Sequence, residues 1–428
     1  MDVFTVRVEK LVYGGDGLGY HGGRPVFVPF VLPGELVEVY PTQESRKLIR
    51  GLPGDLKDPA ADRIEPACPY FARCGGCHYQ HLTYDKQIAL KAEILRETLR
   101  RLGKIDWAAE IPIHAAAPWN YRNRIQLKLG PHPAIPETLQ VGYHRAGSNA
   151  LLAIEECPIS SPKLNQLIAA LNRLSRERAL PRTLRGVEAF VDDRDHTFWL
   201  TLRAPQMDFA REALLEALRT ALDGLLSVEF HETSTDRRSA DGLGWIYTTV
   251  GPEPSGHRLR VSHGSFFQSN RFLLPRLVER VTDGLAGRVA LDLYAGVGFF
   301  TRTLAEKFAR VVAVESNPAA AADLAANVSD LAGVEPRATT VEFFLRHAPE
   351  RCDAAVLDPP RAGLERGVAE ALAELAPPRI VYLSCDPATL ARDLAHLAPR
   401  YRLAALELFD LFPQTFHIET LARLERIA

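Results

Sequence analysis

The last third of the chain alternates strand-like and helical segments in a regular order. Strand-like runs at 288–293, 310–315, 336–340, 353–358 and 379–384 are separated by stretches rich in Ala and Leu, and two more runs follow at 402–408 and 418–424. This alternation is typical of a doubly wound sheet of parallel strands with helices on both faces. We therefore expect an α/β fold whose C-terminal domain is a Rossmann-like, seven-stranded doubly wound sheet.

Two different regions precede this domain. Residues 1–58 combine short strand-like runs with Gly-Gly turns, which predicts a small OB-like β-barrel. From 59 to 262, strand-like runs are mixed with amphipathic helical segments at 84–102 and 209–222, which indicates an α+β central domain. The first of these helices is expected to end with Gly103 in the left-handed C′ position. The expected domains are thus 1–58, 59–262 and 263–428.

Composition excludes several classes of protein. The chain has 428 residues, 46% of them hydrophobic, and a formal net charge of −2, which excludes a disordered chain and a wholly basic surface. No window approaches ~18 uncharged apolar residues, and the first residues do not combine a basic region with an apolar core. We expect a cytoplasmic protein without a membrane span or a secretion signal.

The segment 290–298, ALDLYAGVG, has the pattern of a cofactor-binding turn. It places an acidic residue at a strand end and Gly296 and Gly298 in the turn that follows, where a bulky ligand can approach the backbone. Thr301 occupies the place of the third glycine of a dinucleotide fingerprint, which disfavours NAD. Glu315 ends the next strand, where its carboxylate can accept both ribose hydroxyls of an adenosine. The pattern favours S-adenosylmethionine, a nucleoside cofactor without a phosphate.

Cys385 is a candidate nucleophile. It follows a strand-like run directly and precedes Asp386 and Pro387, so its thiol is expected in a loop at the ligand-binding edge of the sheet. Burial as a small apolar residue is the alternative, and it is the expected state of Cys352. A thiolate that adds to carbon 6 of a uracil turns carbon 5 into an enolate carbon that can attack the methyl group of a sulfonium.

Such an adduct needs a base that removes the proton from carbon 5. The segment 412–420, FPQTFHIET, supplies Glu419 between apolar neighbours, where desolvation would raise its proton affinity. An exposed carboxylate on an edge strand is the alternative for Glu419. His417 is a competing base, because neighbours at i and i+2 on one strand face the same side.

Five stretches of the sequence together resemble the class I RNA uracil-C5 methyltransferase family that carries an N-terminal TRAM barrel. They are LDLYAGVG, VAVESN, LDPPRAGL, YLSCDP and FPQTFHIE. The resemblance spans essentially the whole chain. It implies that Cys385 is the nucleophile and Glu419 the general base. It also implies that the cofactor contacts are Gln268, Tyr294, Gly296, Gly298, Glu315, Thr340 and Asp358. Thr340 stands where the family commonly has an Asp facing the adenine, and Phe299 stands where it often has Asn.

Four cysteines form a further set that predicts a metal centre. Cys68, Cys74 and Cys77 lie close together in the sequence, and Cys157 lies apart from them. Four thiolates suit either tetrahedral zinc or an iron-sulfur cluster, and the spacing does not decide between them. The cluster-bearing members of the resembling family use this pattern for a 4Fe-4S cluster, so we expect that group, in a structural role, and keep zinc as the alternative.

RNA is the expected partner. The segment from Lys91 to Lys128 has eight Lys or Arg and four Asp or Glu, interleaved with Trp119 and Tyr121, which could hold phosphates and stack bases or could be a solvated helix face with core aromatics. By resemblance to the cluster-bearing enzymes, the target is a uridine of 23S ribosomal RNA. We expect a monomer, although the sequence leaves the oligomeric state open. The alternatives are a transfer RNA T-loop uridine, a non-catalytic RNA-binding module, and a DNA cytosine methyltransferase. The last is disfavoured because Ser384, and not Pro, precedes the cysteine.

Overall fold

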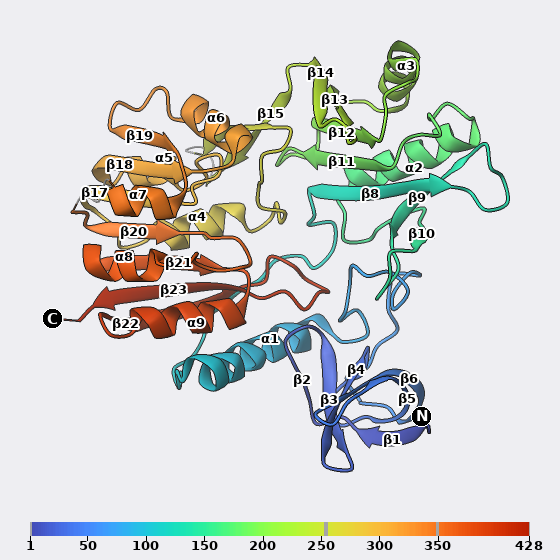
Figure 1. The fold of residues 1–428 in the computed structure, drawn as a ribbon, viewed down its shortest axis with the longest axis horizontal. Helices are drawn as coiled ribbons and strands as arrows, with labels where there is room; N and C mark the ends of the chain where they lie inside the picture. Colours follow the sequence, from blue (N-terminus) through green and yellow to red (C-terminus); the bar gives the residue numbers. More distant parts are fainter. Residues whose placement is uncertain (1, 252–255, 348–350, 428) are drawn as a thin grey trace.

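The protein consists of three parts, and the computed structural model describes residues 2–251, 256–347 and 351–427. Figure 1 shows an N-terminal β-barrel, a central sheet flanked by helices, and a C-terminal α/β part whose sheet is stacked between two layers of helices. Among the described residues, no helix is long and apolar enough to cross a membrane.

The N-terminal part is a six-stranded, strongly bent sheet in the order β1-β5-β6-β4-β3-β2. Its strands are β1 (Phe4–Arg7), β2 (Lys10–Leu11), β3 (Asp16–His21), β4 (Arg24–Pro29), β5 (Leu36–Glu44) and β6 (Ile49–Asp58). Alternate residues of these strands, mostly valines, face inward and form a separate apolar core. The expected β-barrel fold of this region is confirmed.

The central part is a seven-stranded sheet in the order β10-β9-β8-β11-β12-β13-β14. Its elements are β8 (Arg124–Pro131), β9 (Leu139–His144), β10 (Leu151–Ala153), α2 (Pro162–Arg176), β11 (Gly186–Val191), β12 (Phe198–Ala204), α3 (Arg211–Ala221), β13 (Leu225–Glu232) and β14 (Arg237–Gly242). Helices α2 and α3 cover the sheet and enclose a second core with it. A two-stranded sheet, β15 (Trp245–Val250) with β16 (His257–Ser262), leads to the C-terminal part.

The C-terminal sheet has the order β19-β18-β17-β20-β21-β23-β22-β7. Its strands and helices are α4 (Leu274–Thr282), β17 (Gly287–Leu293), α5 (Thr301–Ala305), β18 (Phe308–Glu315), α6 (Pro318–Asn327), β19 (Val334–Ala338), α7 (Val341–His347), β20 (Ala354–Leu357), α8 (Val368–Leu375), β21 (Arg379–Ser384), α9 (Pro387–Leu397), β22 (Tyr401–Phe409) and β23 (Glu419–Arg426). The five strands from β19 to β21 in the sheet order are parallel to one another, and β23 is antiparallel to both β21 and β22. The predicted doubly wound fold and its seven strands are confirmed.

Two elements of the central segment belong spatially to this C-terminal part. The short strand β7 (Ile113–His114) adds an eighth strand by pairing in parallel with β22. Helix α1 (Tyr84–Thr98) and the π-helical turn η1 (Leu99–Gly103) pack against α9. The expected division of the chain at 262/263 stays a prediction, but it separates these elements in sequence from the sheet on which they lie.

The predicted end of the first helix is correct to within one residue, but for a different reason. Lys104, and not Gly103, takes the left-handed conformation, with a φ of 56°. Gly103 is required by packing, since a Cβ atom there would lie 2.9 Å from the carbonyl oxygen of Ala391 in α9.

Candidate active site

The predicted site residues gather at one edge of the C-terminal sheet because the parallel strands all end there. Glu315 is the last residue of β18, Asp358 follows β20, and Cys385 follows β21. Strand β23 runs in the opposite direction, and its pairing of Thr420 with Ser384 brings Glu419, its first residue, to the same edge beside Cys385. The sheet topology therefore places the candidate nucleophile, base and cofactor residues together.

The glycine turn after β17 is built around positive φ angles. Tyr294, Gly296 and Gly298 have φ values of 64°, 57° and 90°. A Cβ atom at Gly298 would lie 3.1 Å from a methyl group of Leu324, so the turn lies close against α6. Glu315 fixes it from the next strand, because its Oε2 accepts a hydrogen bond from the Gly296 amide at 2.9 Å. The hydroxyl of Tyr294 donates to Glu365.

The carboxyl groups of Asp292, Glu315 and Asp358 act on one another's charge near this turn. Gln268 donates from Nε2 to Oδ2 of Asp358 at 3.2 Å, and Thr301 donates to Oδ2 of Asp292 at 2.5 Å. Burial raises the pKa of Asp292 to about 7, with a further contribution from the charge of Glu315. Burial, followed by the charge of Asp292, raises the pKa of Asp358 to about 7. A cation bound here would relieve this repulsion.

Cys385 and Glu419 are electrostatically coupled. Burial raises the pKa of the Cys385 thiol to about 12, and the charges of Glu419 and Asp358 add to this effect. Glu419 is 2% exposed, and its Oε1 has no hydrogen-bond partner among the described residues. Burial and the charge of Asp358 raise its pKa well above the usual range. Arg361 opposes both shifts, so its guanidinium is the cation that favours the charged forms of these two groups.

His417, the competing base, lies against a cation. A guanidinium nitrogen of Arg361 is 3.1 Å from its Nε2. Burial, followed by the charge of Arg361, lowers the pKa of His417 to about 3, so its ring is neutral. It lies before the first residue of β23, so it does not share a strand with Glu419 as the sequence suggested.

Thr340 lies at the rim of the site. It is exposed, and its Oγ1 accepts a hydrogen bond from the Phe343 amide at 3.2 Å, which caps the start of α7. Its side chain therefore has a local structural role in addition to the adenine-facing position predicted for it.

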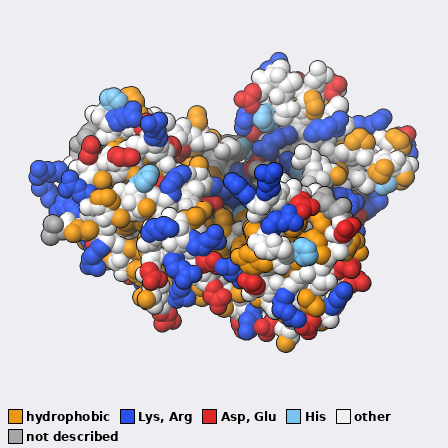
Figure 2. Space-filling model, turned by 60° about the horizontal axis from the view of Figure 1, so that its bottom comes forward, with side chains coloured by type: hydrophobic (Ala, Val, Ile, Leu, Met, Phe, Trp, Pro, Cys, Tyr) orange, Lys and Arg blue, Asp and Glu red, His pale blue; other side chains and the backbone are white. Residues whose placement is uncertain are grey.

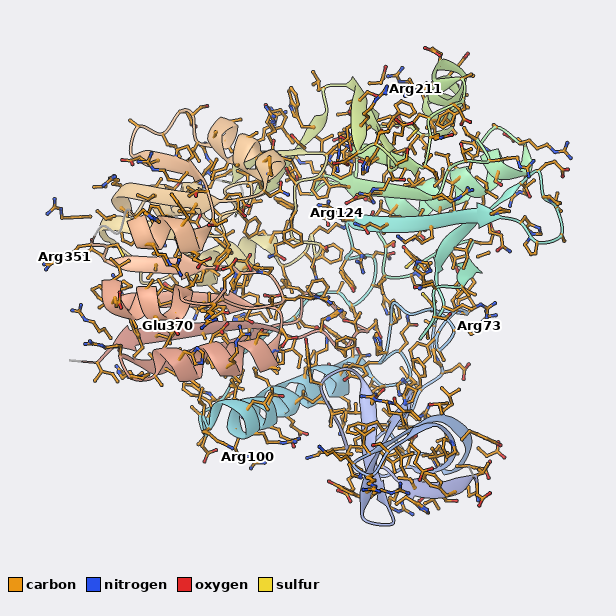
Figure 3. All side chains as sticks on the ribbon, in the orientation of Figure 1. Arg73, Arg100, Arg124, Arg211, Arg351 and Glu370 are labelled. Carbon is orange, nitrogen blue, oxygen red and sulfur yellow. The ribbon has the colours of Figure 1, made fainter. Side chains whose placement is uncertain are left out.

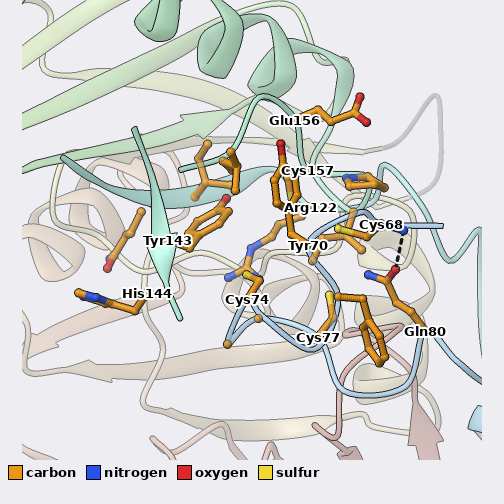
Figure 4. Close-up of a pocket in the computed structure, with 18 of the residues that line it drawn as sticks. Cys68, Tyr70, Cys74, Cys77, Gln80, Arg122, Tyr143, His144, Glu156 and Cys157 are labelled. Atoms are coloured by element: carbon orange, nitrogen blue, oxygen red, sulfur yellow. Dashed lines mark hydrogen bonds between the residues drawn. The ribbon is translucent and has the colours of Figure 1, made fainter. Parts of the chain in front are cut away.

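The four cysteines of the predicted metal centre line one cavity. Cys68, Cys74, Cys77 and Cys157 surround a cavity of about 540 Å³ (Figure 4). Burial raises the pKa values of the first three thiols, that of Cys77 to about 12. Within the described ranges, no group of three or more His, Cys, Asp or Glu side chains is close enough to hold a single metal ion. The four cysteines therefore line one cavity, while their role as ligands of a metal centre stays a prediction.

Two residues predicted as possible RNA contacts are buried. Lys91 is 0% exposed and donates to Oδ1 of Asp410 at 2.6 Å, and Tyr121 is 0% exposed and donates to the Pro413 carbonyl at 3.1 Å. The alternative, a solvated helix face with core aromatics, is correct for Tyr121, which lies in the core, but it is wrong for Lys91, which faces neither solvent nor an RNA surface. Lys and Arg side chains instead gather around a hollow between the three parts of the molecule (Figure 2). Arg73 and Arg124 are on the side of the central part that faces the other two parts (Figure 3).

Sequence reasoning gave no individual role to two residues of the site. Asp292 is the acidic residue of the ALDLYAGVG segment, and Arg361 is the arginine of LDPPRAGL. The charge of Asp292 contributes to the raised pKa of Asp358, while Arg361 contacts His417 and its charge opposes the raised pKa values of Cys385 and Glu419. Asp292 stands one residue before the end of β17 and Arg361 lies in the loop after β20, and this place at the carboxyl ends of parallel strands was the signal that could have identified them.

Comparison with protein families gives two matches. The profile of the family described as tRNA (Uracil-5-)-methyltransferase matches residues 83–334 and 346–427. The profile of the TRAM domain matches residues 2–43, within the N-terminal barrel.

Individual relatives match over the full length. An uncharacterized RNA methyltransferase of Aquifex aeolicus is 34% identical over 98% of this chain and 98% of its own length. The 23S rRNA (uracil(1939)-C(5))-methyltransferase RlmD of Shewanella woodyi is 32% identical over 98% of this chain and 95% of its own length. The Pyrococcus abyssi tRNA (uracil-54, C5)-methyltransferase, solved with S-adenosyl-L-homocysteine, is 24% identical and superimposes with a TM-score of 0.77 over 98% of this chain and all of that chain. The last match shows a shared fold.

Proposed function

The chain belongs to the tRNA (uracil-5-)-methyltransferase family, and from this premise we propose that it methylates carbon 5 of a uridine in RNA through a covalent adduct with Cys385. The family makes it an S-adenosylmethionine-dependent RNA uracil-C5 methyltransferase. The observation that carries the proposed mechanism is the pairing of Ser384 with Thr420, which brings Cys385 and Glu419 to the same edge of the sheet, where the charge of Arg361 acts on both.

The residues around the glycine turn fit S-adenosylmethionine. This ligand has a sulfonium and an ammonium group, and the repulsion between Asp292 and Asp358 favours a cation next to them. Glu315 keeps one acceptor position on each carboxylate oxygen for a ribose hydroxyl, after its bonds to the Gly296 and Asn317 amides. When bound, S-adenosylmethionine supplies an electrophilic methyl group. Gln268 and Asp358 would hold its cationic end, while Tyr294, Gly296, Gly298 and Thr340 would line the nucleoside.

The reaction begins with the Cys385 thiolate. Its sulfur adds to carbon 6 of the uracil, and the electrons of the double bond between carbons 5 and 6 move into an enolate on oxygen 4. The electrons of the enolate would then form the bond from carbon 5 to the methyl group, oxygen 4 would become a carbonyl again, and the electron pair of the broken sulfur–methyl bond would leave with S-adenosylhomocysteine. Glu419 takes the proton from carbon 5, the electrons re-form the double bond, and the thiolate of Cys385 leaves. Arg361 stabilises the anionic form of both residues, since it lowers both pKa values.

The proposed target is 23S ribosomal RNA. Full-length relatives with this name support it, as does the set of four cysteines. A transfer RNA uridine is the second candidate, because the family description names transfer RNA. The target base has to leave its stack to reach Cys385, and the Lys and Arg side chains around the hollow of Figure 2 would attract the phosphates of the RNA. We propose that the protein acts as a monomer.

We also propose that the cysteine cavity holds a 4Fe-4S cluster. The four thiols line one cavity of about 540 Å³, and a cubane binds four cysteine thiolates at its corners. Zinc would need all four sulfur atoms at about 2.3 Å from one point. In the proposed role the cluster ties the loop 68–77 to Cys157 and takes no part in methyl transfer.

The first test is a methylation assay. The purified protein is incubated with labelled S-adenosylmethionine and unmethylated ribosomal or transfer RNA, and the RNA is digested to nucleosides. We expect 5-methyluridine in 23S RNA, and loss of the label in Cys385→Ala. Label confined to transfer RNA would identify transfer RNA, and not 23S ribosomal RNA, as the target. Absence of 5-methyluridine from both RNAs would contradict the proposed methyltransferase function.

A second variant separates the two catalytic roles. Glu419→Gln keeps the nucleophile and removes the base, so the methylated adduct forms but is not resolved. We expect a protein–RNA complex that survives denaturing electrophoresis in Glu419→Gln, and none in Cys385→Ala. If Glu419→Gln forms 5-methyluridine over many turnovers at the rate of the unchanged protein, Glu419 is not the base.

A further inference from the structure

The first turn of the N-terminal barrel reaches the nucleophile loop. Tyr13, between β2 and β3, donates a hydrogen bond from its hydroxyl to Oδ2 of Asp386 at 3.0 Å and lies 3.5 Å from the carbonyl oxygen of Cys385. The other oxygen of Asp386, Oδ1, accepts hydrogen bonds from the amides of Ala388 and Thr389 at 2.9 and 3.0 Å. Asp386 is therefore the N-cap of α9, and its two oxygens are divided between this helix and the barrel.

The same turn also contacts the loop that carries the base. The ring of Tyr13 packs edge-on against the ring of Phe416 with centroids 5.6 Å apart. The ring of His78 packs edge-on against the same Phe416 at 4.7 Å, and a Cβ atom at Gly15 would lie 3.2 Å from His78. The turn of Tyr13 and Gly15 is therefore held between the loop of Cys385 and the loop that leads to Glu419.

The direction of the Tyr13 hydrogen bond is fixed by its surroundings. Burial, followed by the charge of Asp386, raises the pKa of Tyr13 above its usual range, so its hydroxyl keeps the proton and acts as the donor. The charge of Asp386 also raises the pKa of the Cys385 thiol. A donor on Oδ2 fixes this oxygen in place and offsets part of its negative charge, so it limits the charge that acts on the thiol.

We propose that Tyr13 is a positioning residue for the nucleophile: through Asp386 it fixes the backbone and the electrostatic surroundings of Cys385. The barrel is then part of the catalytic centre in addition to any role in binding RNA. This inference rests on the proposed function only in taking Cys385 as the nucleophile. It uses an interaction between two parts of the chain that are 372 residues apart in sequence.

Tyr13→Phe in the full-length enzyme tests the role of the hydroxyl, because the ring and its contact with Phe416 remain. A hydrogen bond to a charged group is stronger than one between neutral groups, so we expect kcat to fall about tenfold or more. The KM and the Kd for RNA should stay within about twofold, since the hydroxyl is used within the protein. Tyr20→Phe is the matched control, since Tyr20 lies in the same barrel, is 50% exposed, and should leave both constants unchanged.

Alkylation of Cys385 gives a second readout that does not depend on methyl transfer. Iodoacetamide labelling at pH 8 to 10 is followed by mass spectrometry of the peptide that contains Cys385, which separates it from the other cysteines. Without the hydroxyl, Oδ2 of Asp386 loses its donor and more of its negative charge acts on the thiol, so labelling of Tyr13→Phe should be slower by about threefold or more at each pH. Tyr20→Phe should be labelled at the rate of the unchanged protein.

The outcomes are distinguishable. Unchanged kcat together with unchanged labelling overturns the proposal, and a raised KM for RNA with unchanged kcat identifies Tyr13 as an RNA contact instead. If the unchanged protein makes no 5-methyluridine, the proposed function fails. The labelling rates alone then decide whether Tyr13 positions Cys385.

Discussion

At the scale of single residues, the protonation of Asp292 and Asp358 is coupled to the binding of a cation beside them. Both have pKa values raised to about 7 by burial and by neighbouring negative charge, so near neutral pH each is partly protonated in the free protein. A bound cation stabilises the ionised forms and lowers both pKa values. Binding of the methyl donor therefore releases protons, and its affinity rises as the pH increases through about 7.

This coupling predicts a proton release that calorimetry can measure. Titration of S-adenosylmethionine at pH 7 in buffers of different ionisation enthalpy should show release of protons, and the Kd should fall with a slope of at most about tenfold per pH unit for each proton released. S-adenosylhomocysteine is the matched ligand, because it lacks the sulfonium charge and should release fewer protons. Asp358→Asn should reduce the release as well. Equal proton release with both ligands in the unchanged protein would contradict the explanation.

At the scale of elements, the loop that carries the base is tied to the cysteine loop. The amides of His78 and Tyr79, which directly follow Cys77, donate to the carbonyl oxygen of Gln414 at 2.8 and 3.0 Å. Gln414 has a φ of 68°, an uncommon conformation for a residue other than glycine, and its side chain accepts from Nε2 of Gln87 at 2.9 Å. The geometry of this loop therefore depends on the contacts that surround it.

The proposed cluster should thus stabilise the base loop. In Cys74→Ala, the iron and sulfide content should fall, and the amides of 411–418 should exchange with deuterium faster than in the unchanged protein, because the loop that holds Gln414 is released. Cys352→Ala is the control, since Cys352 is a buried cysteine outside the cavity. Absence of iron from the unchanged protein after anaerobic purification would contradict the cluster, and unchanged exchange in Cys74→Ala would contradict the coupling.

The elements themselves were predictable, while their contacts with distant segments were not. Period and turn residues located the strands of the C-terminal sheet and the loops after them, which is why Glu315, Asp358 and Cys385 could be placed at one edge. The same periodicity predicted an apolar face for α1, but it did not identify the segments that cover this helix. Lys91 was therefore expected at the surface, whereas it is buried against Asp410. Tyr13 showed no signal, because its contact with Asp386 exists only when the barrel is docked.

At the scale of the whole molecule, a buried ion pair joins α1 to the end of the C-terminal sheet. Lys91 of α1 forms an ion pair at 2.6 Å with Asp410, which follows β22, and both side chains are 0% exposed. The ammonium group also donates to the carbonyl of Phe412 at 3.0 Å. Since α1 precedes the central sheet in sequence, this pair connects the central segment to the end of the methyltransferase sheet.

We therefore expect the substitution Lys91→Met to lower the free energy of unfolding strongly. The substitution fills most of the space of the lysine side chain and leaves the Asp410 carboxylate buried without its cation, which typically costs about 3–5 kcal/mol. Lys86→Met, on the same helix, is the matched control, because its pair with Asp62 is 3.3 Å long and about half exposed on both sides and should contribute about 0–1 kcal/mol. Urea unfolding followed by circular dichroism measures both free energies of unfolding. If residues 263–428 fold independently of α1, the Lys91→Met transition should keep the midpoint of the unchanged protein; a midpoint lowered for the entire transition would show that α1 and the C-terminal sheet unfold as one unit.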